Sequence, residues 1–185
     1  TAMTSNGAYT PTVSEVVVTY VVNATPEFDT SFASSGVAVI QVATTSDSNW
    51  GKVKIDYRIR DTDSTSNAVT STFSYNTGAG FTSIGSGALS GTFGAGVSVS
   101  TSSYSTHTAY WDAASTTAGT YSTTTQIRVT IDDAEGANNT TSTDVTFTLD
   151  TKNPTTGTLT FDAGVAGSSG SAALTINSAD DSSRE

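Results

Sequence analysis

The 185-residue chain is acidic, because 17 Asp and Glu residues against 7 Lys and Arg residues give a formal net charge of −10. This balance argues against nucleic acid as a partner, since binding a phosphate backbone requires clustered basic side chains. The chain has no cysteine, which excludes disulfides, thiol catalysis and cysteine-ligated metals. It has no apolar run long enough to cross a membrane, so we expect no membrane insertion.

The N-terminal part predicts an arm followed by two strands. Residues 1–12 are small and polar, and we expect them to be a flexible or partner-held arm. Val13–Val22 is nearly continuous in β-branched residues, which is typical of a strand covered on both faces. Gly36–Ala43 predicts the next strand, with Gln41 on the same face as two valines.

The clearest element is the stretch Gly51–Asp63, GKVKIDYRIRDTD. Its apolar residues alternate strictly with charged residues, which indicates a half-buried strand with one row of side chains in a core. We expect this strand to be the centre of a β-sandwich. Trp50, which directly precedes it, is expected to be a core residue beside that strand.

The middle of the chain predicts a hairpin and then a less regular part. Val69–Tyr75 reads as a strand, and Phe81–Ile84 as its returning partner. The glycines of the loop at Asn76–Gly80 allow the positive φ angles that such turns need. The Gly- and Ser-rich stretch Gly85–Gly96 predicts no regular structure, and Val97–Tyr110 predicts one further short strand.

Two more alternating segments, Thr125–Asp132 and Asp144–Asp150, predict a hairpin. No stretch has helical periodicity. The whole pattern predicts an all-β protein, an immunoglobulin-like antiparallel β-sandwich over residues 13–152. Residues 153–185 contain two further strand-like runs, which are either the start of an incomplete second β domain or a tail that pairs with a neighbouring chain.

Five motifs in this order carry a resemblance to a known class of domain: GKVKIDYRIRDTD, FSYNTGAGF, AYWDA, IRVTIDDAEG and FTLDTKNP. The series, over roughly Thr45–Pro154, resembles the immunoglobulin-like or fibronectin-III-like repeats of large bacterial cell-surface and S-layer proteins. The resemblance implies an extracellular structural module of the bacterial surface, commonly in tandem and commonly assembled. It implies no catalysis.

The acidic residues at the predicted strand ends suggest calcium, which binds six to eight oxygen ligands. We expect one pole of the sandwich to gather Asp61, Asp63, Asp150, Asp180 and Asp181. A weaker set is expected at the opposite pole: Asp47, Asp132, Asp133 and Glu135. The alternative is that these acids are solvated turn residues, because Asp favours turns in any case.

Enzymatic activity is not expected. The single histidine, His107, lies in a Ser- and Thr-rich stretch, and no serine has the G-x-S-x-G surroundings of a strained nucleophile. Aromatic residues near that histidine suggest an alternative function as an adhesin or carbohydrate-binding module. Its glycan-binding residues would be Trp111, Tyr104, Tyr110 and His107.

The function that the sequence favours is that of a structural module in an extracellular surface assembly, an S-layer or a filament. We expect it to self-associate with copies of itself, or with tandem neighbouring domains, through strand edges and domain poles, since an added strand satisfies the edge N–H and C=O groups. The expected assembly residues lie in the first predicted strand and in the tail: Val16, Val18, Tyr20, Val22, Leu159, Phe161, Leu174 and Ile176.

Overall fold

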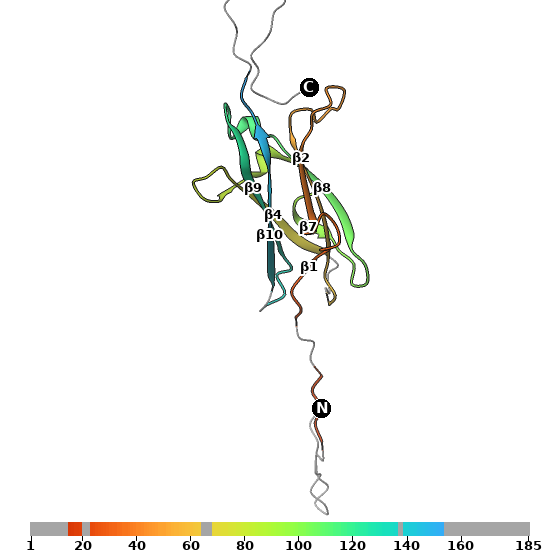
Figure 1. The fold of residues 1–185 in the computed structure, drawn as a ribbon. Helices are drawn as coiled ribbons and strands as arrows, with labels where there is room; N and C mark the ends of the chain where they lie inside the picture. The colour runs from red at the N-terminus through yellow and green to blue at the C-terminus, as the bar shows by residue number, and fades with distance from the viewer. Residues whose placement is uncertain (1–14, 20–22, 64–67, 137–138, 154–185) are drawn as a thin grey trace, which may run out of the picture.

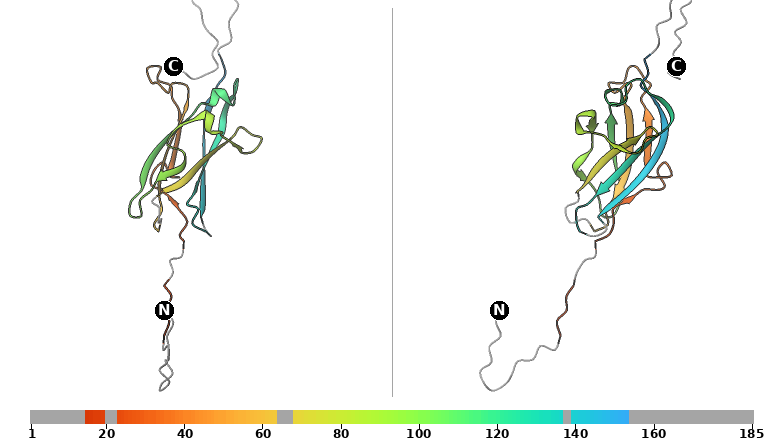
Figure 2. Two further views of the ribbon diagram at one scale, coloured as in Figure 1. Left: turned by 180° about the vertical axis from the view of Figure 1, so that it is seen from behind. Right: turned by 90° about the vertical axis from the view of Figure 1, so that its left-hand side faces the viewer.

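The computed structural model describes residues 15–19, 23–63, 68–136 and 139–153, and these form two antiparallel β-sheets in a β-sandwich-like arrangement (Figures 1 and 2). The first sheet has the order β1 (Glu27–Phe28), β3 (Val53–Arg60), β8 (Ser105–Trp111), β6 (Leu89–Gly91), and β2 (Val37–Gln41) also pairs with β3. The second has the order β10 (Thr140–Asp150), β9 (Tyr121–Asp132), β4 (Ala68–Asn76), β5 (Thr82–Ser83), and β7 (Gly94–Ser98) also pairs with β4. The helical structure of the described residues consists of 3-10 turns at Ser86–Ala88 and Ala113–Ser115, and neither is long enough to span a membrane.

The predicted central strand is confirmed as β3, which lies between β2 and β8 in the first sheet. Its four apolar residues are fully buried, as the alternation predicts: Val53, Ile55, Tyr57 and Ile59. The charged residues of the other face are held in ion pairs. Lys54 Nζ lies 2.8 Å from Asp56, and Arg60 Nη2 lies 2.8 Å from Glu27 of β1. The sheet therefore has one apolar face toward the core and one paired, charged face toward solvent.

Trp50 lies at the surface and not in the core, where the sequence predicted it. Its side chain is 49% exposed, whereas Trp111 at the end of β8 has no exposed surface. The Trp111 ring stacks on Tyr75 with 4.9 Å between ring centroids, and its Nε1 donates a hydrogen bond to Thr116 Oγ1 at 3.0 Å. Trp50 is outside the core because it lies in the turn before β3, and the inward row of that strand begins only at Val53.

The predicted strand Val13–Val22 is wrong where the structure describes it. Residues 15–19 form no strand, and the three valines Val16, Val17 and Val18 are 76%, 74% and 75% exposed. They lie away from the sheets in Figure 1, where this segment is drawn in red. The other residues of the prediction, Tyr20 and Val22 among them, lie outside the described residues.

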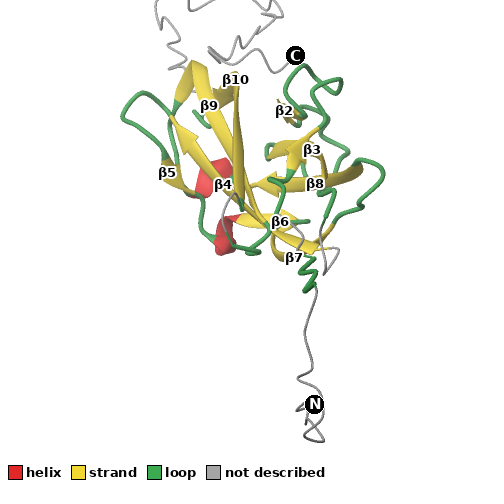
Figure 3. Ribbon diagram, turned by 90° about the horizontal axis from the view of Figure 1, so that it is seen from below, coloured by secondary structure: helices red, strands yellow, loops and turns green. Residues whose placement is uncertain are grey.

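The Gly- and Ser-rich stretch Gly85–Gly96, for which the sequence predicted no regular structure, contributes to both sheets. After β5 at the edge of the second sheet, the chain crosses to add β6 to the first sheet and then returns as β7 to the second. Figure 3 shows β5, β6 and β7 from below. The crossing depends on Gly91, whose φ is +85° and whose position leaves no room for a Cβ, which would lie 2.5 Å from the carbonyl oxygen of Thr108.

The described chain enters and leaves the sandwich at opposite ends. Residues 23–26 lead into β1 at the end where β3 finishes, and residues 151–153 continue from β10 at the other end (Figure 1). The predicted tail, residues 154–185, lies outside the described residues, and with it lie Leu159, Phe161, Leu174 and Ile176. The predicted N-terminal arm, residues 1–12, lies outside them as well.

Candidate functional site

Two buried carboxylates and one half-buried carboxylate gather at the end of the sandwich where the chain enters, and we call the group Asp61, Asp63 and Asp133 the acidic pole. Asp61 directly follows β3 and has no exposed surface. Its backbone N–H donates to the carbonyl oxygen of Ser100 at 3.3 Å. Its carboxylate oxygens have no well-formed hydrogen bond from a described residue, and the backbone N–H of Asp63 offsets only part of the cost of their charge. A buried carboxylate in that state bears most of the desolvation cost of its charge.

The other two carboxylates of the acidic pole hold the segment that enters the sandwich. Asp63 Oδ2 accepts a hydrogen bond from the backbone N–H of Ala24 at 2.7 Å, while its Oδ1 is buried with no hydrogen bond from a described residue. Asp133 follows β9 and is 6% exposed. Its Oδ2 accepts a long hydrogen bond, 3.4 Å, from the side-chain Nδ2 of Asn23. The carboxylates thus come from the ends of strands in both sheets and meet the chain just before β1.

The electrostatics of the acidic pole disfavour the charged form of Asp61. Burial, the neighbouring carboxyl of Asp63 and the charge of Asp133 together raise the pKa of this carboxyl to about 6, although a hydrogen bond from the backbone N–H of Asp63 acts in the opposite direction. The carboxyls of Asp61 and Asp63 lie close enough to share a proton, so when both are ionised they face each other only as acceptors. At neutral pH this pole therefore concentrates negative charge in a poorly solvated place.

The described basic residues supply no counter-charge to the acidic pole. The ion pairs of the described residues lie on the outer faces of the sheets: Lys54 with Asp56, Arg58 with Asp29, Arg60 with Glu27, and Arg128 with Asp144. The two further described lysines, Lys52 and Lys152, lie beside the start of β3 and the end of β10, at the opposite end of the sandwich.

The acidic residues lie in different groups from the two sets that the sequence predicted. Asp61 and Asp63 lie together as predicted, but Asp150 does not join them, and Asp180 and Asp181 lie outside the described residues. The backbone of Asp150 is hydrogen-bonded to Gln41, which pairs with Val53 at the start of β3, whereas Asp61 follows the end of that strand. The expected grouping of Asp150 is therefore wrong, because β3 and β10 finish at opposite ends.

The weaker acidic set is also divided between the two ends. Asp133 belongs to the acidic pole, and its neighbours Asp132 and Glu135 follow β9 in the same turn. That turn is organised by the carboxylates themselves, since Asp132 Oδ1 accepts from the N–H of Ala134 at 2.8 Å. Asp47 lies in the exposed turn before β3, at the other end. The sequence contained the signal for Asp133, a pair of acids at a strand end, but not the strand directions that bring it to Asp61.

The four residues of the predicted glycan site do not form one surface. His107 and Trp111 are buried on the inner face of β8, while Tyr110 is half-buried on its outer row, opposite Lys54. His107 lies against Tyr57, with 5.2 Å between ring centroids, and burial lowers the pKa of its imidazole. Tyr104, half-buried, donates its hydroxyl to Glu27 at 3.2 Å.

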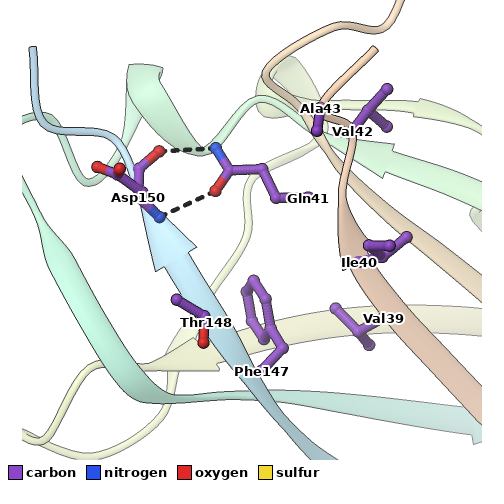
Figure 4. A pocket seen from close by; sticks show the side chains of 8 residues that line it. All are labelled: Val39, Ile40, Gln41, Val42, Ala43, Phe147, Thr148 and Asp150. Atoms are coloured by element: carbon purple, nitrogen blue, oxygen red, sulfur yellow. Dashed lines mark hydrogen bonds between the residues drawn. The ribbon is translucent and has the colours of Figure 1, made fainter. Parts of the chain in front are cut away.

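A second feature is an open side of the sandwich between β2 and β10, which we call the edge groove. It encloses about 230 Å³ and is lined by Val39, Ile40, Gln41, Val42, Ala43, Phe147, Thr148 and Asp150 (Figure 4). In the described part of the chain β2 pairs only with β3 and β10 only with β9, so each strand has one edge without a partner strand. Ile40 is 63% exposed here, which leaves apolar surface beside these edges.

One end of the edge groove is closed by the side chain of Gln41. Its Nε2 donates to the carbonyl oxygen of Asp150 at 2.7 Å and to that of Gly51 at 3.1 Å, and its Oε1 accepts from the backbone N–H of Asp150 at 2.9 Å. The amide of Gln41 thus pairs with β10 as the backbone of an added strand would. In the sequence, the only indication of this role is that Gln41 lies on the same face of its predicted strand as two valines.

A third feature is a hollow of about 320 Å³ at the end where the chain leaves. It is formed around the exposed Trp50, with Lys52, Asp112 and Asn153 beside it. An exposed indole next to polar groups is a surface on which a ligand with one apolar face and several hydroxyls can stack.

Comparison of the chain with protein families, with curated proteins and with solved structures returned no match. Function is therefore inferred from the geometry of these three sites and from the resemblance of the motifs.

Proposed function

We propose that the chain is an immunoglobulin-like structural module of an extracellular bacterial surface assembly, an S-layer or a filament, whose copies associate by strand addition. In this proposal the segment Glu15–Thr19 of one copy lies in the edge groove of a second copy. The observation that carries the proposal is that one protein contains both a candidate strand and a place for it. Three valines are exposed outside the sheets, and an apolar groove lies between two strand edges that have no partner strand in the described chain.

The donor segment has the properties of a strand that lacks a sheet. Its three consecutive β-branched residues favour extended backbone, yet they are about three-quarters exposed in the single chain. Burying a valine side chain contributes on the order of 1.5–3 kcal/mol. Because the segment lies away from the sheets of its own copy, a second copy is the occupant that we propose for the groove.

The acceptor also fits a strand. Val39 and Phe147, from the two sheets, offer apolar side chains to the groove, and the edges of β2 and β10 offer unpaired backbone groups. Strand addition uses both, since main-chain hydrogen bonds give affinity and side-chain pockets give register. The Gln41 amide already occupies the edge of β10 at Asp150, so we expect the added strand to pair with β10 before that residue.

Two further features support a module in a linear array. The chain enters and leaves at opposite ends of the sandwich, which suits head-to-tail repetition. The strand orders, with β3 and β8 central in one sheet and β9 and β4 central in the other, support the immunoglobulin-like assignment. The extracellular bacterial location follows from the resemblance of the motifs to surface-protein repeats.

The test is the association state of the full chain. Sedimentation velocity over a range of concentrations, with negative-stain electron microscopy at the highest, should show concentration-dependent oligomers or filaments. A Val17→Asp variant should remain monomeric, because a carboxylate would be placed in an apolar groove. Thr77→Asp, which adds the same charge in the exposed β4–β5 loop, should associate as the original chain does. Monomers of the original chain at all concentrations would contradict the proposal.

A second candidate function is glycan binding at the Trp50 hollow, favoured by the exposure of that indole beside Asp112 and Asn153. The chain has two tryptophans and Trp111 is buried, so the fluorescence change on ligand binding would report on Trp50. A glycan array probed with the original chain and with Trp50→Ala tests this function. Signals that persist in the variant, or no signal at all, would remove it.

A further inference from the structure

We propose that the end of the sandwich where the chain leaves is a docking face for a second copy, which binds there with its opposite end. We call the two ends the Trp50 end, where the chain leaves, and the acidic end, where it enters. The inference rests on the proposed strand addition and gives it a direction, because the added segment then runs parallel to β10. Copies joined in this way all point the same way along the array.

The edge of β10 that accepts the segment can be identified from backbone hydrogen bonds. The N–H and C=O of Asp150 both bond to the side chain of Gln41, while those of Thr151 bond to the loop before β9. Successive residues of an antiparallel strand direct these groups to alternate sides, and the irregularity in this pairing adds its extra residue to β9. The N–H and C=O of Thr146 and Thr148 therefore point to the side that has no partner strand in the described chain, beside the edge groove.

The short link between the donor segment and its own sandwich makes the direction decisive. Thr19 is separated from Asn23 by three residues, so these two residues lie at most about 14 Å apart. The donor sandwich must therefore lie close to the point where its segment leaves the groove, and it approaches with its acidic end. A segment parallel to β10 leaves the groove at the Trp50 end, because β10 finishes there. An antiparallel segment leaves it toward the acidic end.

The charges of the two ends favour the parallel direction. An antiparallel segment would bring the acidic ends of two copies together, and like charges that face each other across an interface disfavour association. Five acids lie at the acidic end: Asp61, Asp63, Asp132, Asp133 and Glu135. At the Trp50 end two lysines balance two exposed acids: Lys52, Lys152, Asp47 and Asp112. The parallel direction thus places the acidic end of one copy against a nearly neutral surface that carries lysines.

The exposed apolar side chains lie at the same end. In the described chain, the exposed large hydrophobic residues apart from the three donor valines are Ile40, Trp50 and Tyr121. Ile40 precedes Gln41 at the end of β2 and also lines the edge groove, Trp50 lies in the turn before β3, and Tyr121 pairs with Asp150. All three belong to the half of the sandwich that finishes at the Trp50 end. Exposed apolar surface gathered in this way is typical of a protein-interaction site.

Cross-linking between chains with single cysteines tests the direction. A chain carrying Ser48→Cys, in the exposed turn at the Trp50 end, is mixed with a tagged chain carrying Ser102→Cys, in the exposed loop beside the acidic pole. With a short bifunctional maleimide, the mixed dimer should be the major product and should clearly exceed the Ser102→Cys homodimer. Adding Val17→Asp to both chains should abolish the mixed dimer, because this substitution prevents strand addition.

The side chain of Trp50 provides a second test, by sedimentation velocity. Trp50→Ala should weaken association by about tenfold or more, because truncating a tryptophan inside an interface commonly has an effect of this size. Phe81→Ala is the control, since the Phe81 ring lies over Arg128 on the outer face of the second sheet. This variant should associate as the original chain does.

The outcomes separate this inference from the proposed function. If the original chain associates but the Ser102→Cys homodimer is the major product, strand addition stands and the parallel direction is overturned. The docking face is overturned if Trp50→Ala associates as tightly as the original chain, and loss of a glycan signal in that variant would then assign the hollow to glycan binding. An original chain that is monomeric at all concentrations overturns both proposals.

Discussion

The side chain of Gln41 gives the sharpest prediction about stability. It makes three hydrogen bonds, two as a donor and one as an acceptor, and two of the three go to the backbone of Asp150. The two bonds to Asp150 join the edge of the first sheet to the last strand of the second, across the open side of the sandwich, while the third holds the turn before β3 through Gly51. Replacing Gln41 by Ala removes all of them and opens the end of the edge groove.

The expected loss follows from the number of bonds. A hydrogen bond contributes about 1 kcal/mol net, with a spread of about 0.5 kcal/mol, so three part-buried bonds correspond to about 2–4 kcal/mol of unfolding free energy. The Asp150 N–H and C=O are also left to find water at a position that is only 5% exposed, which favours the upper part of this range. Gln41→Glu keeps the shape but places a carboxylate oxygen against the carbonyl oxygens of Asp150 and Gly51, so it should lose at least as much as Gln41→Ala.

Urea unfolding monitored by tryptophan fluorescence measures this loss, because the buried Trp111 reports on the core. Gln126→Ala is the matched control, since the Gln126 amide accepts one bond from Asn76 within the second sheet. The control should cost less than half as much as Gln41→Ala. A loss below about 0.5 kcal/mol for Gln41→Ala, less than one net hydrogen bond, would refute the assignment of Gln41 as the bridge between the sheets.

Three further predictions concern other parts of the fold. Burial lowers the pKa of His107, so the unfolded chain takes up its proton at a higher pH than the folded chain. The free energy of unfolding should therefore fall as pH decreases through the unfolded pKa, by at most about 1.4 kcal/mol per pH unit. Urea titrations from pH 7 to 5 should show a shallower fall for His107→Gln than for the original chain. Gly91→Ala should destabilise the chain more than Gly96→Ala in the same assay. Both glycines have positive φ, but of the two only Gly91 has a position where an added Cβ would lie 2.5 Å from a backbone carbonyl oxygen. Equal losses of unfolding free energy would mean that this close approach is unimportant. Asp144→Asn should leave the urea midpoint unchanged within error, because the ion pair of Asp144 with Arg128 is exposed to solvent, and a clear shift would show that this pair contributes more than its exposure suggests.

The fold could be predicted from the sequence wherever one face of a strand is buried. The strands β3, β9 and β10 alternate apolar and polar residues, and each was predicted within a few residues of its bounds, although β9 and β10 begin earlier than expected. The strands β6 and β7 are built largely from Gly and Ser, so they have no periodic row of apolar side chains to detect. The valines Val16–Val18 have strong strand propensity, but propensity alone does not provide a sheet to join.

The acidic pole could be predicted only in part, for a reason of topology. The sequence identified Asp61 and Asp63 correctly as acids at the end of a central strand. Which further acids join them depends on which strands finish at the same end. That depends on the directions of strands in two different sheets, which the alternation of residues does not encode. Asp133 and Asp150 were therefore assigned to the wrong ends, although each was correctly placed at the end of its own strand.

The central claim, strand addition between copies, is tested most directly by a disulfide between chains. The protein has no cysteine of its own, so single cysteines can be introduced without interference. A chain carrying Val17→Cys, mixed with a tagged chain carrying Ile40→Cys and oxidised mildly, should give the mixed disulfide dimer, because the donor segment would lie in the edge groove. Thr77→Cys, on an exposed loop elsewhere, is the control partner. Mixed dimers with Ile40→Cys that clearly exceed those with Thr77→Cys are the predicted result, and equal yields with both partners, or none with either, would contradict strand addition.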